Sequence, residues 1–442
     1  MKDNDWMDDD ERRAARHRRR VHGQILAYLF LVLLIAIILG ACFGVFTLVR
    51  RYLADQKAQE EQEVIAEVDD TPEEPVEEEP EEEVETGPTA EEQFDEYLTA
   101  YISDMTLEEK AAGLLIVTPE QLTGVSIATQ GGSGTQAALE EYTVGGIVYS
   151  SQNIKSEEQF TEMIANTVSF SKYPLFIAVT EEGGDVSTVL NSAIEVSDVA
   201  SNLEIGADGA SGDAYTQGTT IGGYLSTLGI NLDLAPVTEV TISEDAAISD
   251  RTYGSDAQTV GTLAAQMSQG LESQGVSSTL KSFPGTGDAA SSTEDGAVST
   301  DRDLTSYEEN EFVAFQTAID AGADFVMVSH ITASNLSGSL DPVSMCESVV
   351  TDLLRDTLGF EGVIITEPMN YDAITDYYDL GDAVVSCLKA GCDMILMPSS
   401  VSEAVDAIVE AVEEGTLAEE RINDSLLRIY RVKYADMLAD FE

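Results

Sequence analysis

The stretch SVVTDLLRDTLGFEGVIIT, residues 348–366, contains the pattern that decides the fold. Residues 348–358 predict a helix. The run 362–366 that follows is rich in Val and Ile and lacks polar alternation. Such a run is expected for a strand that is buried on both faces of a parallel sheet. The stretch is therefore interpreted as one helix–strand unit.

Similar units recur through residues 94–434. Repeated helix–strand units are typical of a (β/α) barrel or of an open doubly wound sheet, and periodicity alone favours neither. No G-x-G-x-x-G or Walker pattern follows an early strand, so nucleotide binding is not indicated. Further strands are predicted at 114–118, 146–149, 174–179, 231–235, 325–329 and 393–397, and further helices at 306–321 and 401–414.

The N-terminal part predicts a membrane anchor. Residues 25–49 form an uncharged apolar run, and about 20 helical residues suffice to cross a hydrocarbon core. A cleaved signal peptide is the alternative, but Arg50 and Arg51 follow the run in place of a cleavage site of small residues. Residues 1–24 carry most of the flanking arginines, which predicts a cytoplasmic tail. We therefore expect a single-pass cell-membrane protein with its main domain outside the cell.

Residues 50–93 predict a spacer between the anchor and the main domain. The segment is rich in Glu and contains Pro72, Pro75, Pro80 and Pro88. Like charges repel and prolines block pairing, so an extended, disordered linker is expected. The whole chain has a formal net charge of -60, which excludes nucleic acid as a partner because phosphates would be repelled.

The cysteines indicate neither a zinc site nor a disulfide framework. Cys42 lies in the apolar run, and Cys346, Cys387 and Cys392 lack zinc-ligand spacing. A bridge between the last two remains an alternative, but buried thiols are favoured. No calcium-binding loop occurs either. We expect no metal and no cofactor.

Several segments of the chain form a set that is specific when it is taken together and in order. They are MTLEEKAAGLLIV (105–117), LGINLDLAPVTEV (228–240), RTYGSD (251–256), KSFPGTGD (281–288), AGADFVMVSH (321–330) and GTLAEERINDSLLRI (415–429). This set resembles glycoside hydrolase family 3, nearest to its single-domain bacterial β-N-acetylglucosaminidases. The resemblance covers residues 94–442 and implies a TIM-like (β/α)8 barrel. It also implies a β-N-acetylhexosaminidase-like hydrolase of O-glycosidic bonds with a carbohydrate substrate from cell-wall or extracellular glycans.

In a barrel the chemistry lies where strands end. The positions of interest are therefore 180–185, 236–239, 281–288, His330 and Glu367. A retaining glycosidase needs a nucleophile and an acid/base about 5–5.5 Å apart. The resemblance places the family's nucleophilic Asp at Glu367, one methylene longer, and the family's acid/base His at Glu294.

The resemblance also indicates substrate contacts. The residues that remain for this role are Lys281, Arg251, Asp288, His330 and Glu182. Charged donors such as the first two make the stronger hydrogen bonds to hydroxyl or carboxylate groups. Four positions depart from the family pattern: Thr180, Asp185, Ser282 and Thr286.

Two functions fit these residues, and the sequence favours neither decisively. The first is a divergent but active glycosidase that uses Glu367 and Glu294. The second is a degenerate barrel that binds glycan or a protein partner without turnover. A purely structural role in the cell envelope is a third, weaker hypothesis. A scaffold can outlast its chemistry, so the intact backbone motifs do not distinguish these functions.

Overall fold

The computed structural model describes residues 87–208 and 211–441. The expected cytoplasmic tail, membrane anchor and most of the expected linker lie outside the described residues. Among the residues that are described, no helix is both long and apolar enough to cross a bilayer. The first described helix, α2 (Ala90–Ser103), begins before residue 94, where the folded domain was expected to start.

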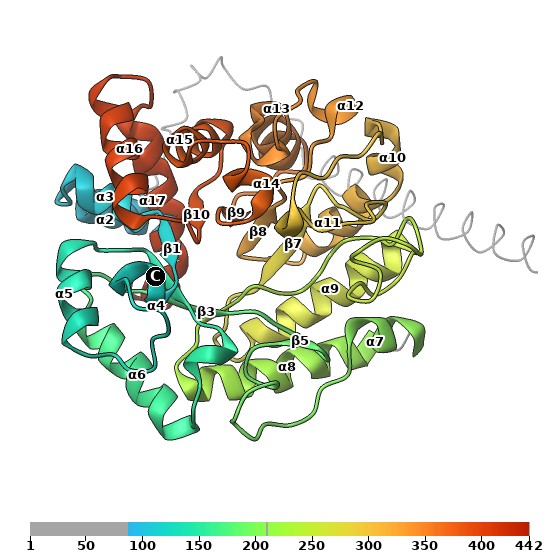
Figure 1. The fold of residues 1–442 in the computed structure, drawn as a ribbon, viewed down its shortest axis with the longest axis horizontal. Helices are drawn as coiled ribbons and strands as arrows, with labels where there is room; N and C mark the ends of the chain where they lie inside the picture. The colour runs from blue at the N-terminus through green and yellow to red at the C-terminus, as the bar shows by residue number, and fades with distance from the viewer. Residues whose placement is uncertain (1–86, 209–210, 442) are drawn as a thin grey trace, which may run out of the picture. The chain divides into compact units, whose positions relative to one another are not determined.

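Eight parallel strands form the centre of the domain (Figure 1). The order in the sheet is β6-β3-β2-β1-β10-β9-β8-β7. Apart from β6 and β7, barrel strands that follow one another along the chain are therefore paired in the sheet, and the last strand, β10, pairs with the first, β1. The edge strands β6 and β7 meet through two isolated parallel bridges, Leu232 with Ser277 and Val237 with Lys281. The sheet is therefore a nearly closed barrel, as expected from the resemblance, and is not an open doubly wound sheet. The barrel strands are β1 (Leu115–Val117), β2 (Gly146–Val148), β3 (Phe176–Val179), β6 (Leu232–Asp233), β7 (Thr279–Phe283), β8 (Phe325–Val328), β9 (Val363–Pro368) and β10 (Met394–Leu396).

Helices surround the strands on the outside (Figure 1). They cover the outer faces of the strands, and the strand residues are buried on both faces, as their unbroken apolar runs predicted. A short hairpin, β4 (Glu181–Gly183) with β5 (Val186–Ser187), follows β3. The helices are α3 (Leu107–Gly113), α4 (Pro119–Thr123), α5 (Ser133–Glu141), α6 (Glu157–Phe170), α7 (Asn202–Asp208), α8 (Ser211–Leu228), α9 (Ala257–Glu272), α10 (Leu304–Glu309), α11 (Glu311–Ile319), α12 (Ser334–Ser337), α13 (Glu347–Val349), α14 (Asp372–Thr375), α15 (Leu380–Ala390), α16 (Val401–Glu413) and α17 (Glu419–Lys433).

Two predicted helices differ in detail from the observed ones. The helix expected at 306–321 is split into α10 and α11 at Asn310, whose φ and ψ of -127° and -94° are not helical. The helix expected at 348–358 consists of α13 and a wider π-helical segment, η4 (Val350–Thr357). The segment η4 is followed directly by β9, so the helix–strand unit predicted for residues 348–366 is confirmed.

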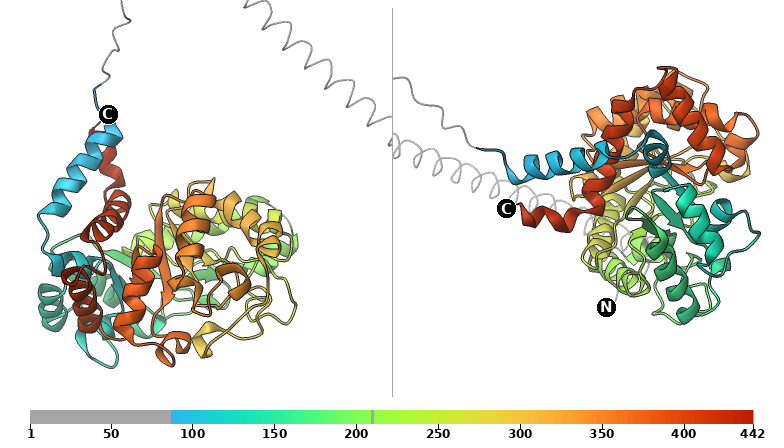
Figure 2. Two further views of the ribbon diagram at one scale, coloured as in Figure 1. Left: turned by 90° about the horizontal axis from the view of Figure 1, so that it is seen from above. Right: turned by 90° about the vertical axis from the view of Figure 1, so that its left-hand side faces the viewer.

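The first and last helices of the domain lie side by side (Figure 2). The α2 helix begins with a capping box at Thr89 and buries Phe94 and Leu98. Asp95 of α2 accepts a hydrogen bond of 2.7 Å from the Nε of Arg431 in α17. The two ends of the described chain are therefore joined, and α2 belongs to the barrel domain.

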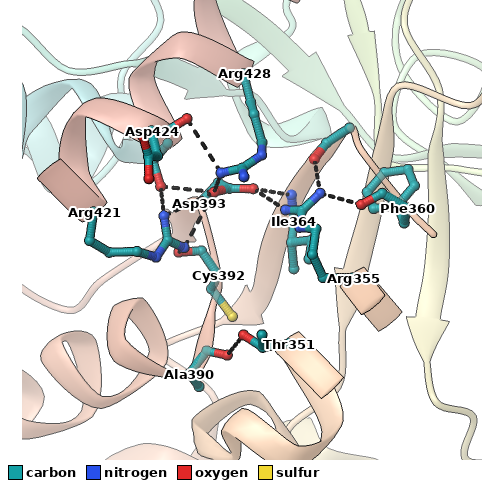
Figure 3. A network of polar contacts seen from close by, with 12 residues as sticks. Thr351, Arg355, Phe360, Ile364, Ala390, Cys392, Asp393, Arg421, Asp424 and Arg428 are labelled. Atoms are coloured by element: carbon teal, nitrogen blue, oxygen red, sulfur yellow. Dashed lines mark hydrogen bonds and ion pairs between the residues drawn. The ribbon is translucent and has the colours of Figure 1, made fainter. Parts of the chain in front are cut away.

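A buried aspartate connects the strand β10 to its surroundings (Figure 3). Asp393 is fully buried and directly precedes β10. One oxygen accepts from Arg355 at 2.7 Å and from the backbone N–H of Ile364 at 3.0 Å. The other lies 3.3 Å from Arg421 and 3.2 Å from Arg428. The network therefore links η4, β9, β10 and α17 at the start of the last strands.

The three described cysteines carry free thiols and are buried, as the sequence favoured. Cys387 and Cys392 are completely buried, and the Sγ of Cys392 lies 3.5 Å from the carbonyl oxygen of Ser344. The alternative of a bridge between Cys387 and Cys392 is therefore wrong for this structure.

Candidate active site

A cavity of about 800 Å³ opens where the barrel strands end. Residues at the ends of six strands line it: Val148, Thr180, Lys281, Met327, Glu367 and Met397. This is the end of a (β/α) barrel where catalytic side chains are found. A second cavity, of about 730 Å³, lies against α2 and α17 and is lined by none of the candidate site residues. The first cavity is therefore the candidate active site.

Glu367, in β9, presents its carboxylate to this cavity and is 8% exposed. Its Oε2 accepts three hydrogen bonds: from the Thr293 hydroxyl at 2.9 Å, the Ser329 hydroxyl at 3.1 Å and the backbone N–H of His330 at 2.7 Å. No described residue donates to its Oε1. One oxygen therefore fixes the orientation of the carboxylate, and the other is available to a ligand.

The loop after β7 brings Glu294 into the same cavity. The Thr293 hydroxyl that binds Glu367 belongs to the residue next to Glu294, in the short helix η2 (Thr293–Asp295). Glu294 lines the cavity and its side chain is exposed. Burial raises the pKa of Tyr371, and the charges of Glu367 and Glu294 raise it further, so both carboxylates lie within electrostatic reach of this phenol.

Three further candidates form one ion-pair cluster. Glu182 is buried and accepts from the Arg251 Nε at 2.9 Å, while the Lys281 Nζ lies 2.6 Å from its Oε1. Burial alone would raise the pKa of Glu182, but the charges of Lys281 and Arg251 lower it. Lys281 and Arg251 line the cavity, and the buried Glu182 forms an ion pair with each of them. The structure therefore brings these predicted contacts together.

The remaining two candidates do not line the cavity. His330 is buried, with its Nδ1 2.8 Å from the Ser344 hydroxyl and its Nε2 3.0 Å from the carbonyl oxygen of Glu367. Burial lowers the pKa of this imidazole, which favours the neutral form. Asp288 accepts from the Thr300 hydroxyl at 2.7 Å. In this structure His330 holds Glu367 in place, and Asp288 holds the loop that follows β7.

Glu239 lines the cavity, and the sequence had placed it among the positions of interest 236–239 without assigning it a role. It is buried and accepts from the backbone N–H of Ser282 at 3.2 Å and the Thr286 hydroxyl at 2.6 Å. Burial raises the pKa of Glu239 to about 7. The charge of Glu367 also raises this pKa, while the hydrogen bonds from Thr286 lower it. The available signal was its place in 236–239, directly after a strand. Glu239 positions the end of β7, which carries Lys281, and the loop after it, which carries Glu294.

The described residues offer no arrangement of three or more His, Cys, Asp or Glu side chains that could hold a metal ion. The chemistry available in the cavity is that of two carboxylates among its lining, one oriented and one exposed, together with a lysine and an arginine. A nucleophile and a proton donor of this kind are the groups that a retaining glycosidase uses.

Comparisons with known proteins point in the same direction. The family model described as "Glycosyl hydrolase family 3 N terminal domain" matches residues 106–432. Beta-hexosaminidase LpqI of Mycobacterium tuberculosis is 30% identical over 346 residues, which cover 74% of this chain and 82% of that protein. Beta-hexosaminidase A of Pseudoalteromonas piscicida is 28% identical over 324 residues, which cover 67% of this chain and 54% of that protein. The chain therefore spans about half the length of this second relative.

A solved structure supports the fold. The glycoside hydrolase family 3 beta-N-acetylglucosaminidase of Paenibacillus sp. str. FPU-7 has a TM-score of 0.71 and 28% sequence identity to this chain. The match covers 76% of this chain and 63% of that one. The likeness therefore extends over most of the barrel domain.

Proposed function

The chain belongs to glycosyl hydrolase family 3, and from this premise we propose that it is a β-hexosaminidase-like glycosidase that acts on cell-wall or extracellular glycans. The observation that carries the proposal is the orientation of Glu367. Three donors fix its Oε2 at the end of β9, while its Oε1 receives no hydrogen bond from the described residues. A nucleophile with one fixed and one free oxygen is pre-organised for attack.

The reaction proceeds in two steps with retention of configuration. Glu367 Oε1 attacks the anomeric carbon and forms a covalent glycosyl-enzyme, while the carboxylic acid of Glu294 protonates the departing glycosidic oxygen. Glu294, now a carboxylate, then takes a proton from water as the water oxygen attacks the anomeric carbon and releases Glu367. Lys281 and Arg251 donate hydrogen bonds to sugar hydroxyls, since both line the cavity.

The decisive experiment assays the full-length chain on aryl β-N-acetylglucosaminide, β-glucosaminide and β-glucoside. We expect turnover by the parent chain and none by Glu367→Gln, which keeps the shape of the side chain but removes the nucleophile. The matched control is Glu413→Gln. Glu413 is an exposed glutamate of α16 that does not line the cavity, so this variant should retain full activity. Equal traces in all three preparations would indicate a contaminating enzyme.

A second measurement tests the covalent step directly. An activated 2-deoxy-2-fluoro-β-glycoside slows hydrolysis of the intermediate, so the glycosyl-enzyme should accumulate. Mass spectrometry of the digested protein is expected to find the added sugar on the peptide that contains Glu367. A label on another carboxylate, such as Glu239, would assign the nucleophile differently.

Binding without turnover is the second candidate function, and the exposure of Glu294 favours it. Glycosidase acids generally owe their proton at neutral pH to burial in an apolar pocket. Glu294 is exposed, and the short helix that carries it has no histidine. In this case the parent chain would bind glycan, and neither aryl glycoside turnover nor a covalent label would be detected.

We also propose that residues 25–49 anchor the chain in the cell membrane, with residues 1–24 in the cytoplasm and the barrel domain outside. The support is the length of the uncharged run and the excess of arginine before it. Protease added to intact cells is expected to remove the barrel domain and to leave an N-terminal fragment with the membranes. Protection of the whole chain until the cells are lysed would reverse this orientation.

A further inference from the structure

The candidate active site is rich in carboxylates. Its five acidic side chains face only two cationic ones, Arg251 and Lys281. The acids do not all lie at the rim, because Glu239 and Glu367 are both largely buried. The acidic side chains that line the cavity are Glu239, Glu294, Asp295, Glu367 and Asp372.

The two cations are already paired. Lys281 lies 2.6 Å from Glu182, and Arg251 contacts both oxygens of the same carboxylate. Glu182 is 2% exposed, so its charge is screened little by water. Glu239, whose pKa burial raises to about 7, is largely protonated below neutral pH, and the proposed reaction uses Glu294 as the acid. The cluster of three therefore presents a single net positive charge against the three remaining carboxylates, Asp295, Glu367 and Asp372.

The walls of the cavity strengthen the resulting field. Leu234, Ile248, Met327 and Leu396 line the same cavity as the charged groups. Apolar walls focus the field of nearby charges into the space they enclose. Glu239 and Glu367 are electrostatic neighbours, because the charge of Glu367 raises the pKa of Glu239. A ligand cation would relieve this repulsion.

We propose that the cavity selects a hexosaminide whose sugar carries a free, protonated amino group, in preference to its N-acetylated or acidic counterpart. This inference rests on the glycosidase function proposed above and narrows its substrate class. An amine at C2 is one carbon away from the anomeric carbon that Glu367 attacks. The ammonium group therefore lies beside the same carboxylates that perform the reaction. An acetamide carries no charge and gains nothing from them.

The test measures binding without turnover. Methyl 1-thio-β-glucosaminide and its N-acetylated form resist hydrolysis and differ only in the amine. Titration calorimetry on the full-length chain at pH 6 and low salt is expected to give a Kd at least about tenfold lower for the free amine, the ratio expected for one charge-assisted contact. This preference should shrink as NaCl is raised, because salt screens the carboxylates.

Two matched variants separate a local effect from the general acidity of the chain. Asp295→Asn and Glu413→Gln each remove one negative charge, the first inside the cavity and the second on α16. Only Asp295→Asn is expected to reduce the preference for the amine, by several-fold. An equal reduction in both variants would attribute the preference to the net charge of -60 and overturn the inference.

The outcomes distinguish this inference from the proposed function. Equal or tighter binding of the N-acetylated thioglycoside overturns the amine preference and leaves glycosidase activity standing. A clear amine preference without turnover of the aryl glucosaminide supports the inference and overturns hydrolysis. Failure of both thioglycosides to bind overturns both proposals.

Discussion

Glu367 reaches its position through a side chain one methylene longer than the aspartate that the family resemblance places there. Its three hydrogen-bond donors fit this longer side chain. In Glu367→Asp the carboxylate would retreat from both the donors and the cavity. Because a misplacement of about 1 Å can cost roughly 100-fold in rate, we expect kcat on aryl hexosaminides to fall by about that factor. A kcat equal to or above that of the parent chain would mean that the cavity is built for the shorter acid.

Much of the candidate site could be predicted from strand ends. Glu367, Lys281 and Arg251 follow from motif positions, and all three line the cavity. The sequence could not show that His330 does not line the cavity. Its backbone N–H orients Glu367, and any residue type could supply that N–H. The role of Glu239 was missed for a related reason: its burial depends on how the loop after β7 folds over it.

Glu239 should also make stability depend on pH. Its folded-state pKa is raised to about 7 from 4.5, so the folded protein holds this proton more tightly than the unfolded chain does. The corresponding stabilisation is present below pH 4.5 and is lost as the pH rises through 7. At about 1.4 kcal/mol per pKa unit it amounts to about 3 kcal/mol at most.

Glu239→Gln mimics the protonated side chain at every pH and tests this dependence. The Tm of the parent chain is expected to fall more than that of the variant between pH 5 and pH 8, so the difference between them narrows or reverses. Differential scanning fluorimetry across this range measures both curves. Parallel curves would show that Glu239 does not titrate in the folded state in this window.

At the scale of elements, Asp393 joins the last two strands to the helices around them (Figure 3). In Asp393→Asn, Arg355, Arg421 and Arg428 would lose their shared counter-ion. Removing one partner of a buried ion pair costs about 3–5 kcal/mol. We expect a loss of this size in the free energy of urea unfolding. Arg428→Gln, in contrast, removes a partly exposed partner and leaves two arginines, so it should cost less than about 1 kcal/mol. Similar losses in both variants would contradict this account of the network.

The elements themselves were largely predictable, and the exceptions have physical causes. Every apolar run interpreted as a strand contains one. The strand β7 was not identified because its sequence, TLKSF, carries Lys281 and Ser282 toward the cavity and so lacks a continuous apolar run. The break at Asn310 was also missed. The buried Glu311, directly after the break, pairs with Arg302 nine residues earlier, a contact that helical periodicity does not record.

Closure of the barrel could not be inferred from periodicity, because open and closed parallel sheets contain the same units. The bridges between Leu232 and Ser277 and between Val237 and Lys281 decide it. The closed barrel was predicted only from the family resemblance, which depends on the order of many motifs along the chain. The local patterns predicted the individual helices and strands.

At the scale of the whole molecule, a formal net charge of -60 opposes compaction through self-repulsion. Raising NaCl from about 10 to about 150 mM shortens the Debye length from about 30 to about 8 Å. Repulsion between exposed carboxylates is then screened, while buried pairs such as Asp393 with its arginines are screened much less. The Tm of the barrel domain should therefore rise by roughly 1–2 °C, equivalent to about 1 kcal/mol for a domain of this size. The same series at pH 4, where many carboxylates are protonated, should show a smaller rise. A Tm that falls with salt at neutral pH would mean that exposed ion pairs contribute more than repulsion does.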